Sequence, residues 1–252
     1  MARAAVRGRL NWLQAEVVAL ADETARVRSF VLDCPGWTGH LPGQHVDIRL
    51  TAEDGYQAQR SYSIATPPDG PRLTITVELV DDGEVSAYLI EEVRVGDGIE
   101  LRGPIGGYFV WEPARGGALQ LIAGGSGLVP LMAMVRSRVA TSGGVPVRML
   151  VSSRSWEDVI YRDELGRIAD GYRGVEIVHT LTRAQPPGWG GYARRVDEAM
   201  LDETVWPADD RPLCYVCGPT GFVETVASTL VQLGHEPGRV KTERFGPSGG
   251  PQ

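Results

Sequence analysis

The sequence is poor in cysteine and histidine and has no long apolar run. Three Cys in 252 residues are too few for a disulfide framework, and they exclude an iron–sulfur cluster held by four thiolates of this chain. The four His include no i, i+4 pair, so we predict no metal site. No apolar run approaches the roughly 20 residues that span a bilayer, and the basic residues 1–10 lack the apolar core of a signal peptide. We therefore expect a cytoplasmic protein that does not enter a membrane.

Runs of basic residues are also missing. The net charge is −7, and no cluster of Lys or Arg could neutralise a phosphate backbone, which disfavours nucleic acid as a partner. The hydrophobic content of 42% and the charged content of 23% are ordinary for a soluble globular protein. A chain of this length can form one large domain or two modest ones.

The first half of the chain is rich in short strand patterns. Gly, Pro and Asp signals separate them, and they cover residues 17–20, 27–32, 45–50, 60–65 and 73–80. Their regular spacing predicts a small antiparallel barrel or sandwich. Gly83–Ile90 is the one predicted helix of this half. Phe109 and Trp111 alternate as on a further strand, and residues 113–117 predict a linker between domains 10–113 and 118–252.

The second half alternates strand, turn and helix. Strands are predicted over residues 119–123, 145–152, 175–182, 212–218 and 239–245, with helices between them. Ser155, followed by Asp158 three residues later, predicts a capped helix over residues 156–169. This rhythm is typical of a doubly wound parallel α/β domain.

The stretch Arg60-Ser61-Tyr62-Ser63 combines a cation, an aromatic ring and hydroxyls on one predicted strand. Arg suits bidentate contact with phosphate, and Tyr can stack on a flat ring. The stretch therefore suits a phosphorylated aromatic cofactor. An ordinary strand with a surface Arg and a packed Tyr is the alternative, because it would have the same sequence pattern. The helix start at Gly83–Ser86 offers backbone N–H groups to a pyrophosphate, and a plain helix start is the alternative.

Two turns of the second half predict a nucleotide site. Gly124–Gly127 closes the first strand, where this fold binds phosphate, but it matches neither the GxGxxG fingerprint nor the GxSxG nucleophile elbow. A purely structural turn is the alternative. Cys217 ends a later strand at the edge where ligands bind. Cys214 and Cys217 do not predict a redox disulfide, because residues three apart on a strand face opposite sides.

The ends of the second and third strands favour NADPH over NADH. An NAD site usually has an acidic residue at the second strand end. Here the strand ends Ser153-Arg154, and Arg183 ends the neighbouring strand. The two cations could meet one 2′-phosphate; two solvated arginines are the alternative.

Together these stretches resemble the ferredoxin–NADP reductase superfamily, in its bacterial form without a fused iron–sulfur domain. The resemblance spans Trp12 to Phe245 and rests on RSYS, the Gly83 turn, GPIGGYF, GGSGLVP, CGPTGF and ERF, in the family's order. It implies a flavin-binding antiparallel β-barrel followed by a nucleotide-binding α/β domain. It implies a flavin site formed by Arg60, Ser61, Tyr62, Ser63, Val77, Gly83, Val85, Ser86 and Phe245. It implies a nicotinamide-nucleotide site formed by Gly125, Ser126, Gly127, Ser153, Arg154, Arg183, Cys217, Gly218 and Pro219. The implied catalytic residues are Ser63, Cys217 and Glu243.

The resemblance also implies an activity. NADPH (or NADH) would reduce bound FAD, which is favoured over FMN, and electrons would pass to a separate acceptor such as a ferredoxin, an oxygenase component or another redox enzyme. A reductase of free flavin, ferric complexes or quinones remains an alternative, as does a non-catalytic flavin-binding subunit. The segment 246–252 continues past the point where plant-type members end.

Overall fold

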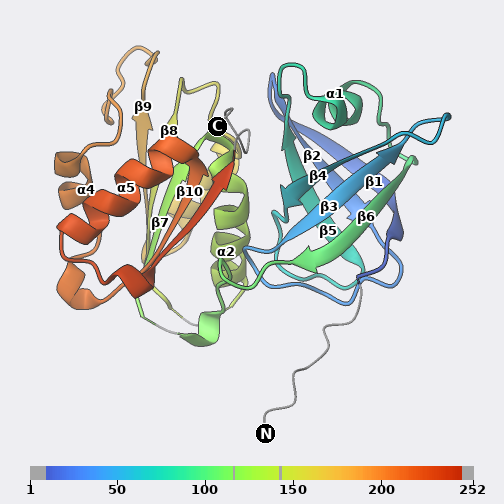
Figure 1. Ribbon diagram of the computed structural model, residues 1–252. Coiled ribbons are helices and arrows are strands. Elements are labelled where there is room, and N and C mark those ends of the chain that lie inside the picture. Colours follow the sequence, from blue (N-terminus) through green and yellow to red (C-terminus); the bar gives the residue numbers. More distant parts are fainter. Residues whose placement is uncertain (1–9, 116, 142–143, 246–252) are drawn as a thin grey trace, which may run out of the picture.

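The computed structural model describes residues 10–115, 117–141 and 144–245, and they form two sheets with their helices (Figure 1). The segment 246–252 and all but the last residue of the basic segment 1–10 lie outside this part. None of the helices in the described ranges is long and apolar enough to cross a lipid bilayer.

The first sheet is antiparallel and has the order β4-β3-β6-β1-β2-β5. Its strands are β1 (Leu13–Thr24), β2 (Val27–Asp33), β3 (His45–Thr51), β4 (Gln57–Ser63), β5 (Arg72–Glu78) and β6 (Gly98–Ile105). A bridge between Ile64 and Ile75 brings the two edge strands together, so the sheet curls into a barrel. Helix α1 (Glu84–Glu91) covers β4 and β5 at the top of Figure 1. The predicted barrel is confirmed.

The second sheet is parallel and has the order β11-β10-β7-β8-β9. Its strands are β7 (Leu119–Gly124), β8 (Val147–Ser153), β9 (Val175–Leu181), β10 (Leu213–Pro219) and β11 (Val240–Phe245). Its helices are α2 (Leu128–Ala140), α3 (Arg162–Gly171), α4 (Glu198–Thr204) and α5 (Thr220–Gln232). Alternate strand residues pack against α2 and α3 on one face and against α4 and α5 on the other. This two-sided burial is why the strands read as apolar runs, and the doubly wound prediction is confirmed.

The segment 106–112 is not a strand, so that prediction was wrong, and strand β6 just before it was not predicted. Phe109 and Trp111 are buried although neither belongs to a strand. The Phe109 ring meets Tyr215 edge-on at 5.3 Å, and the Trp111 N–H donates to the carbonyl of Pro42. Their alternation therefore reflects packing of a connecting segment against the second sheet.

Helix α3 begins later than the sequence pattern predicts. Ser155 does bond to Asp158, through its N–H and its hydroxyl at 3.1 and 2.9 Å, but these bonds close a turn. Tyr161 has a left-handed backbone with φ of 55°, which no α-helix can continue through. The helix consequently starts at Arg162, and the predicted start at Ser155 was wrong.

Candidate functional site

The arginine and tyrosine of the RSYS stretch lie at the end of edge strand β4. Arg60 is exposed, and its guanidinium donates to the carbonyl of Gln59 at 2.7 Å; no acidic side chain within the described ranges pairs with it. Tyr62 is half-buried against the barrel core, and this burial raises the pKa of its hydroxyl to about 12. An unpaired cation and a neutral phenol ring therefore lie two residues apart, on one face of the strand.

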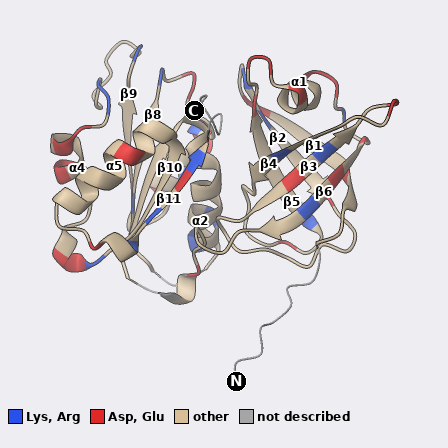
Figure 2. Ribbon diagram, in the orientation of Figure 1, with Lys and Arg blue, Asp and Glu red and all other residues tan. Residues whose placement is uncertain are grey.

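Ser61 faces the opposite way and belongs to a charged network. Its hydroxyl donates to Asp47 Oδ1 at 2.6 Å, and Arg102 donates to Asp47 Oδ2 at 2.6 Å. Asp47 and Arg102 are register partners on the paired strands β3 and β6, where Figure 2 shows residues of both charges. Burial alone would raise the pKa of Asp47, but the bonds from Arg102 and Ser61 lower it below its ordinary value. The Ser61 side chain thus holds β4 against β3, and its backbone is what remains for a cofactor.

Helix α1 begins at the predicted glycine turn. Gly83 is the N-cap residue, and no side chain caps the helix, so the first N–H groups are available to an anion. The hydroxyl of Ser86 donates to the carbonyl of Gly83 and accepts the N–H of Val80, both at 3.2 Å. A Cβ at position 83 would lie 2.6 Å from that hydroxyl. Val77 and Val85 are buried in the barrel core, so only their backbone can meet a cofactor.

The glycine-rich turn after β7 packs directly against the end of β10. Gly125–Gly127 forms one turn of 3-10 helix between β7 and α2. A Cβ at Gly127 would lie 2.0 Å from the carbonyl oxygen of Cys217. Gly125 instead has φ of 56° and is exposed, with no atom within 4 Å of its Cβ position, and Ser126 is half-buried beside it. Gly127 therefore serves packing, while Gly125 leaves room for a phosphate to approach.

Cys217 and Glu243 lie side by side on the parallel strands β10 and β11. The thiol donates to Glu243 Oε2, with 4.0 Å between sulfur and oxygen. Burial, reinforced by the Glu243 carboxyl, raises the pKa of Cys217 well above its usual value, and burial raises the pKa of Glu243 to about 7. Gly218 and Pro219 complete this edge, where Pro219 pairs with Phe245. The site offers a neutral thiol and a carboxyl that titrates near neutral pH.

Replacing Glu243 with Gln should change how stability depends on pH. The folded protein keeps the Glu243 proton up to a pKa of about 7, whereas the unfolded chain releases it near 4.5. Stability of the wild type should therefore fall as pH rises from 4.5 to 7, by at most about 1.4 kcal/mol per pH unit. Urea unfolding across this range should show that the free energy of unfolding of the wild type falls relative to that of the Gln variant as the pH rises. Exposed Glu53→Gln is the control, and parallel curves for Glu243→Gln would contradict the assignment.

Cys214 and Cys217 point to opposite faces of the sheet, as predicted. Cys214 packs with the cluster under α4 and α5, and Cys217 with the cluster under α2 and α3. Both thiols are free. The pair is therefore not a redox disulfide in this structure.

Arg154 and Arg183 lie beside each other beyond the ends of β8 and β9. The N–H of Arg183 donates to the carbonyl of Arg154 at 2.8 Å, and the N–H of Thr182 donates to that of Ser153 at 2.9 Å. Both arginine side chains are exposed, and neither forms an ion pair within the described part of the chain. The structure thus brings the two cations to one edge, as predicted, while Ser153 is buried beneath them.

An aromatic cluster lies next to these strand ends. The Trp156 ring meets His179 edge-on at 5.3 Å and Trp189 at 5.4 Å. Burial lowers the pKa of His179 to about 4, so the imidazole is neutral at physiological pH. The positive charge of this edge therefore comes from the arginines and not from the histidine.

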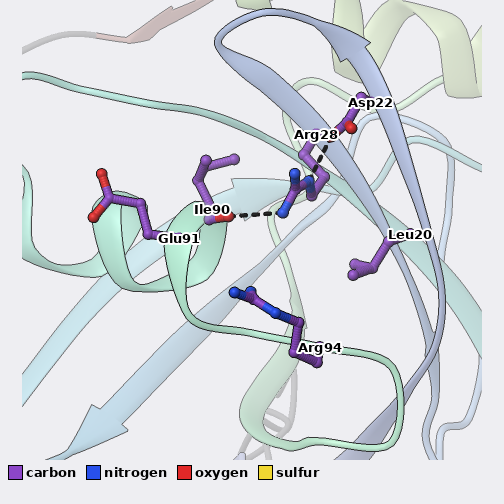
Figure 3. Close-up of a pocket in the computed structure, with 6 residues that line it drawn as sticks. All are labelled: Leu20, Asp22, Arg28, Ile90, Glu91 and Arg94. Atoms are coloured by element: carbon purple, nitrogen blue, oxygen red, sulfur yellow. Dashed lines mark hydrogen bonds and ion pairs between the residues drawn. The ribbon is translucent and has the colours of Figure 1, made fainter.

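An open cavity of about 390 Å³ lies elsewhere, on the barrel beside the end of α1 (Figure 3). It is lined by Leu20, Asp22, Arg28, Ile90, Glu91 and Arg94. Arg28 bridges Asp22 Oδ1 at 2.6 Å and the carbonyl of Ile90 at 2.7 Å, which anchors the helix end to β1 and β2. None of the predicted site residues lines this cavity, and we assign its arginine bridge a structural role.

Two family models match the chain, one for each sheet. Residues 14–110 match the oxidoreductase FAD-binding domain, and residues 121–228 match the oxidoreductase NAD-binding domain. The chain belongs to the ferredoxin–NADP reductase superfamily. As a member, it carries an FAD-binding barrel followed by an NAD-binding α/β domain.

Known proteins agree with this superfamily assignment. The FAD/NAD-binding domain of nitric oxide dioxygenase from Vibrio cholerae is 28% identical, with a TM-score of 0.82 over 93% of this chain and 99% of that one. The Amycolatopsis cytochrome P450 reductase GcoB is 27% identical, with a TM-score of 0.82 over 98% of this chain and 74% of that one. The glycine betaine monooxygenase reductase subunit of Chromohalobacter salexigens is 32% identical over 91% of this chain. This chain spans 63% of that relative's length.

Within the superfamily fold, sequence reasoning missed the residues that support the site from behind. Asp47 and Arg102 are 55 positions apart and meet only because β3 and β6 pair. Tyr161 lay inside a predicted helix. Asp47 alternates with the core residues Val46 and Ile48, so it lies on the outer face of β3, and no local pattern predicts its burial there.

Proposed function

We propose that this chain uses NADPH (or NADH) to reduce bound FAD and passes the electrons to a separate acceptor protein. One observation carries the proposal: a single chain joins an FAD-binding and an NAD-binding domain, and the latter holds a thiol–carboxyl pair at its ligand-binding edge. When bound, the flavin accepts a hydride from the nicotinamide and can release electrons singly or in pairs, so the protein supplies placement and charge. We take residues 10–113 and 118–252 as the two domains.

The barrel residues fit FAD. Arg60 has no acidic partner among the described residues, so its guanidinium is available to the diphosphate, together with the uncapped start of α1 at Gly83. We assign the Tyr62 ring to one face of the isoalloxazine and Phe245 to the other. Ser63 would donate a hydrogen bond near flavin N5.

The parallel sheet supplies the nicotinamide side. Gly125 and Ser126 would hold the nucleotide diphosphate, because this turn is open and begins α2. Cys217 would orient the nicotinamide as a neutral thiol, next to Gly218. Glu243 would hold or release a proton near neutral pH and so balance charge when the flavin is reduced.

Replacing Arg60 with Ala should weaken FAD binding by at least about tenfold, because a charge-assisted hydrogen bond contributes roughly 1.5–3 kcal/mol. Titration of the apoprotein with FAD, followed by flavin fluorescence, measures the change. Arg72→Ala, exposed at the start of β5, is the matched control and should bind FAD normally. A purified Arg60→Ala variant with wild-type FAD affinity would remove Arg60 from the site.

The relatives support a protein acceptor. The Chromohalobacter relative is named as the reductase subunit of a monooxygenase, and GcoB as a cytochrome P450 reductase. We propose that this chain works in the cytoplasm beside an oxygenase, a ferredoxin or a similar redox protein. Anaerobic NADPH should bleach the flavin, and the reduced protein should then reduce a ferredoxin or cytochrome c faster than free FMN, ferric complexes or quinones. A flavin that NADPH cannot bleach would indicate a non-catalytic subunit.

A further inference from the structure

Tyr161 and Arg136 of the α/β domain form hydrogen bonds to barrel residues outside the connecting segment 106–112. The hydroxyl of Tyr161 meets Thr76 Oγ1 of β5 at 2.5 Å, and Arg136 Nη1 of α2 donates to the carbonyl of Ala65 at 2.7 Å. Tyr161 and Ala65 are buried, and Val27 and Ala65 of the barrel belong to the same apolar cluster as the residues of α2 and α3. In Figure 1, α2 accordingly lies on the side of its sheet that faces the barrel.

The Tyr161 contact continues as a directed chain of hydrogen bonds over three neighbouring strands of the barrel. Ser29 donates its single hydroxyl hydrogen to Glu23 Oε1 at 2.6 Å. Thr76 must therefore donate to Ser29, at 2.8 Å, and Tyr161 must donate to Thr76. The chain crosses β5, β2 and β1 and ends on a carboxylate. Any residue without a donor at position 161 would leave the buried Thr76 oxygen short of its partner.

Arg136 and Tyr161 act as one unit. Arg136 holds Glu164 of α3 in a bidentate pair, at 2.8 and 2.6 Å, and its guanidinium carbon lies 4.5 Å from the centre of the Tyr161 ring. The arginine side chain is only 18% exposed, so solvent screens these contacts weakly. Tyr161 has a left-handed backbone and directly precedes α3, which starts at Arg162.

Both contacts end beside the flavin-binding residues. Ala65 comes two residues after Ser63, and Thr76 directly precedes Val77. On the other domain, α2 begins where the Gly125–Gly127 turn ends. A shift of either contact would therefore move the nucleotide turn relative to the flavin strands.

We propose that Arg136 and Tyr161 are positioning residues that latch the NAD-binding domain to the FAD-binding barrel and set the distance for hydride transfer. The consequence for hydride transfer rests on the proposed function, whereas the latch itself does not. Residues 108–110 also contact β10 and β11, next to the covalent connection of the two domains, whereas Arg136 and Tyr161 contact Ala65 and Thr76 of the barrel.

The test uses Tyr161→Phe, which removes one hydroxyl, and Arg136→Met combined with Glu164→Gln, which leaves no unpaired charge. Amide hydrogen exchange of residues 64–66 and 74–77 should quicken in both variants, with FAD content unchanged. Stopped-flow reduction of the flavin by NADPH should slow by at least about tenfold while the Kd for NADPH stays constant, because misplacement affects the reacting geometry rather than binding. Tyr192→Phe, whose hydroxyl meets Glu203 within the α/β domain, is the control and should match the wild type.

Two further variants separate positioning from general destabilisation. Thr76→Ser keeps the hydroxyl and should retain the wild-type rate, whereas Thr76→Val should match Tyr161→Phe. Adding Thr76→Val to Tyr161→Phe should slow reduction no further, since both break one contact. Unchanged exchange in the Tyr161 and Arg136 variants would overturn the latch. Altered exchange in a protein whose wild type is not reduced by NADPH would overturn the proposed function and leave the latch standing.

Discussion

Replacing Gly127 with Ala is expected to destabilise the protein by more than about 3 kcal/mol, at the upper end of overpacking costs. The new Cβ would lie 2.0 Å from the carbonyl oxygen of Cys217, 2.4 Å from its carbon and 2.7 Å from the N–H nitrogen of Gly218. All three are backbone atoms of β10, so no side-chain rotation can relieve the clash. The turn would have to move away from the strand end that holds the thiol–carboxyl pair. Urea unfolding measures the loss of stability.

Two glycine controls distinguish a clash from other costs of adding a methyl group. Gly221→Ala, in the first turn of α5, meets nothing within 4 Å and should be neutral or slightly stabilising. Gly125→Ala meets nothing either, but its φ of 56° should cost about 1 kcal/mol. The expected order of stability is thus Gly221→Ala, then Gly125→Ala, then Gly127→Ala. A Gly127 variant as stable as the Gly125 variant would show that the turn can move freely.

The glycine turn also shows what a sequence can and cannot predict about a site. Its position after an apolar strand predicted that a turn closes β7 and leads into α2, because the rhythm of apolar runs determines where strands end. Gly127 has no room for a side chain, whereas Gly125 has open space beside it. This difference depends on how closely β10 approaches the turn. That approach joins residues about 90 positions apart, so no local pattern contains it.

The same distinction separates the correct from the incorrect fold predictions. The parallel sheet was predictable because strands that are buried on both faces consist of uninterrupted apolar runs. The segment around Phe109 was misread because a connecting segment that packs on Tyr215 shows the same alternation as a strand. Helix α3 was started too early because the Ser155–Asp158 pair is a genuine turn signal, and the left-handed Tyr161 that ends the turn has no sequence signature.

The latch and the cofactor residues follow this division too. Arg60, Tyr62 and Gly83 could be proposed as cofactor residues because a strand or a helix start displays each of them locally. Arg136 and Tyr161 sit in the other domain and contribute through contacts to Ala65 and Thr76. Candidate cofactor residues can therefore be proposed from short stretches of sequence, whereas the contacts proposed as the latch appear only when the two domains meet.

Replacing both Arg154 and Arg183 with Ala is expected to lower kcat/KM for NADPH by about 100-fold and to leave kcat/KM for NADH within about threefold. Each guanidinium should contribute roughly 1.5 kcal/mol or more to a 2′-phosphate contact, and 1.4 kcal/mol corresponds to a factor of ten. Both side chains are exposed and without an ion pair in the described part of the chain, so their loss should not disturb the fold. The backbone bond between them holds the two strand ends together in any variant.

A matched control removes the same charge elsewhere. Arg167 lies within α3, and Arg173 lies two residues after its end; both are exposed. Replacing both with Ala changes the net charge by the same amount. The Arg167/Arg173 variant should keep the wild-type ratio of kcat/KM for NADPH to kcat/KM for NADH. In the Arg154/Arg183 variant this ratio should fall. Raising the salt concentration should weaken NADPH binding to the wild type more than to the Arg154/Arg183 variant, because the variant lacks the contact with the 2′-phosphate that salt screens. An unchanged NADPH/NADH ratio in that variant would show that the two cations are merely solvated, and the nucleotide preference would then have to come from elsewhere in the site.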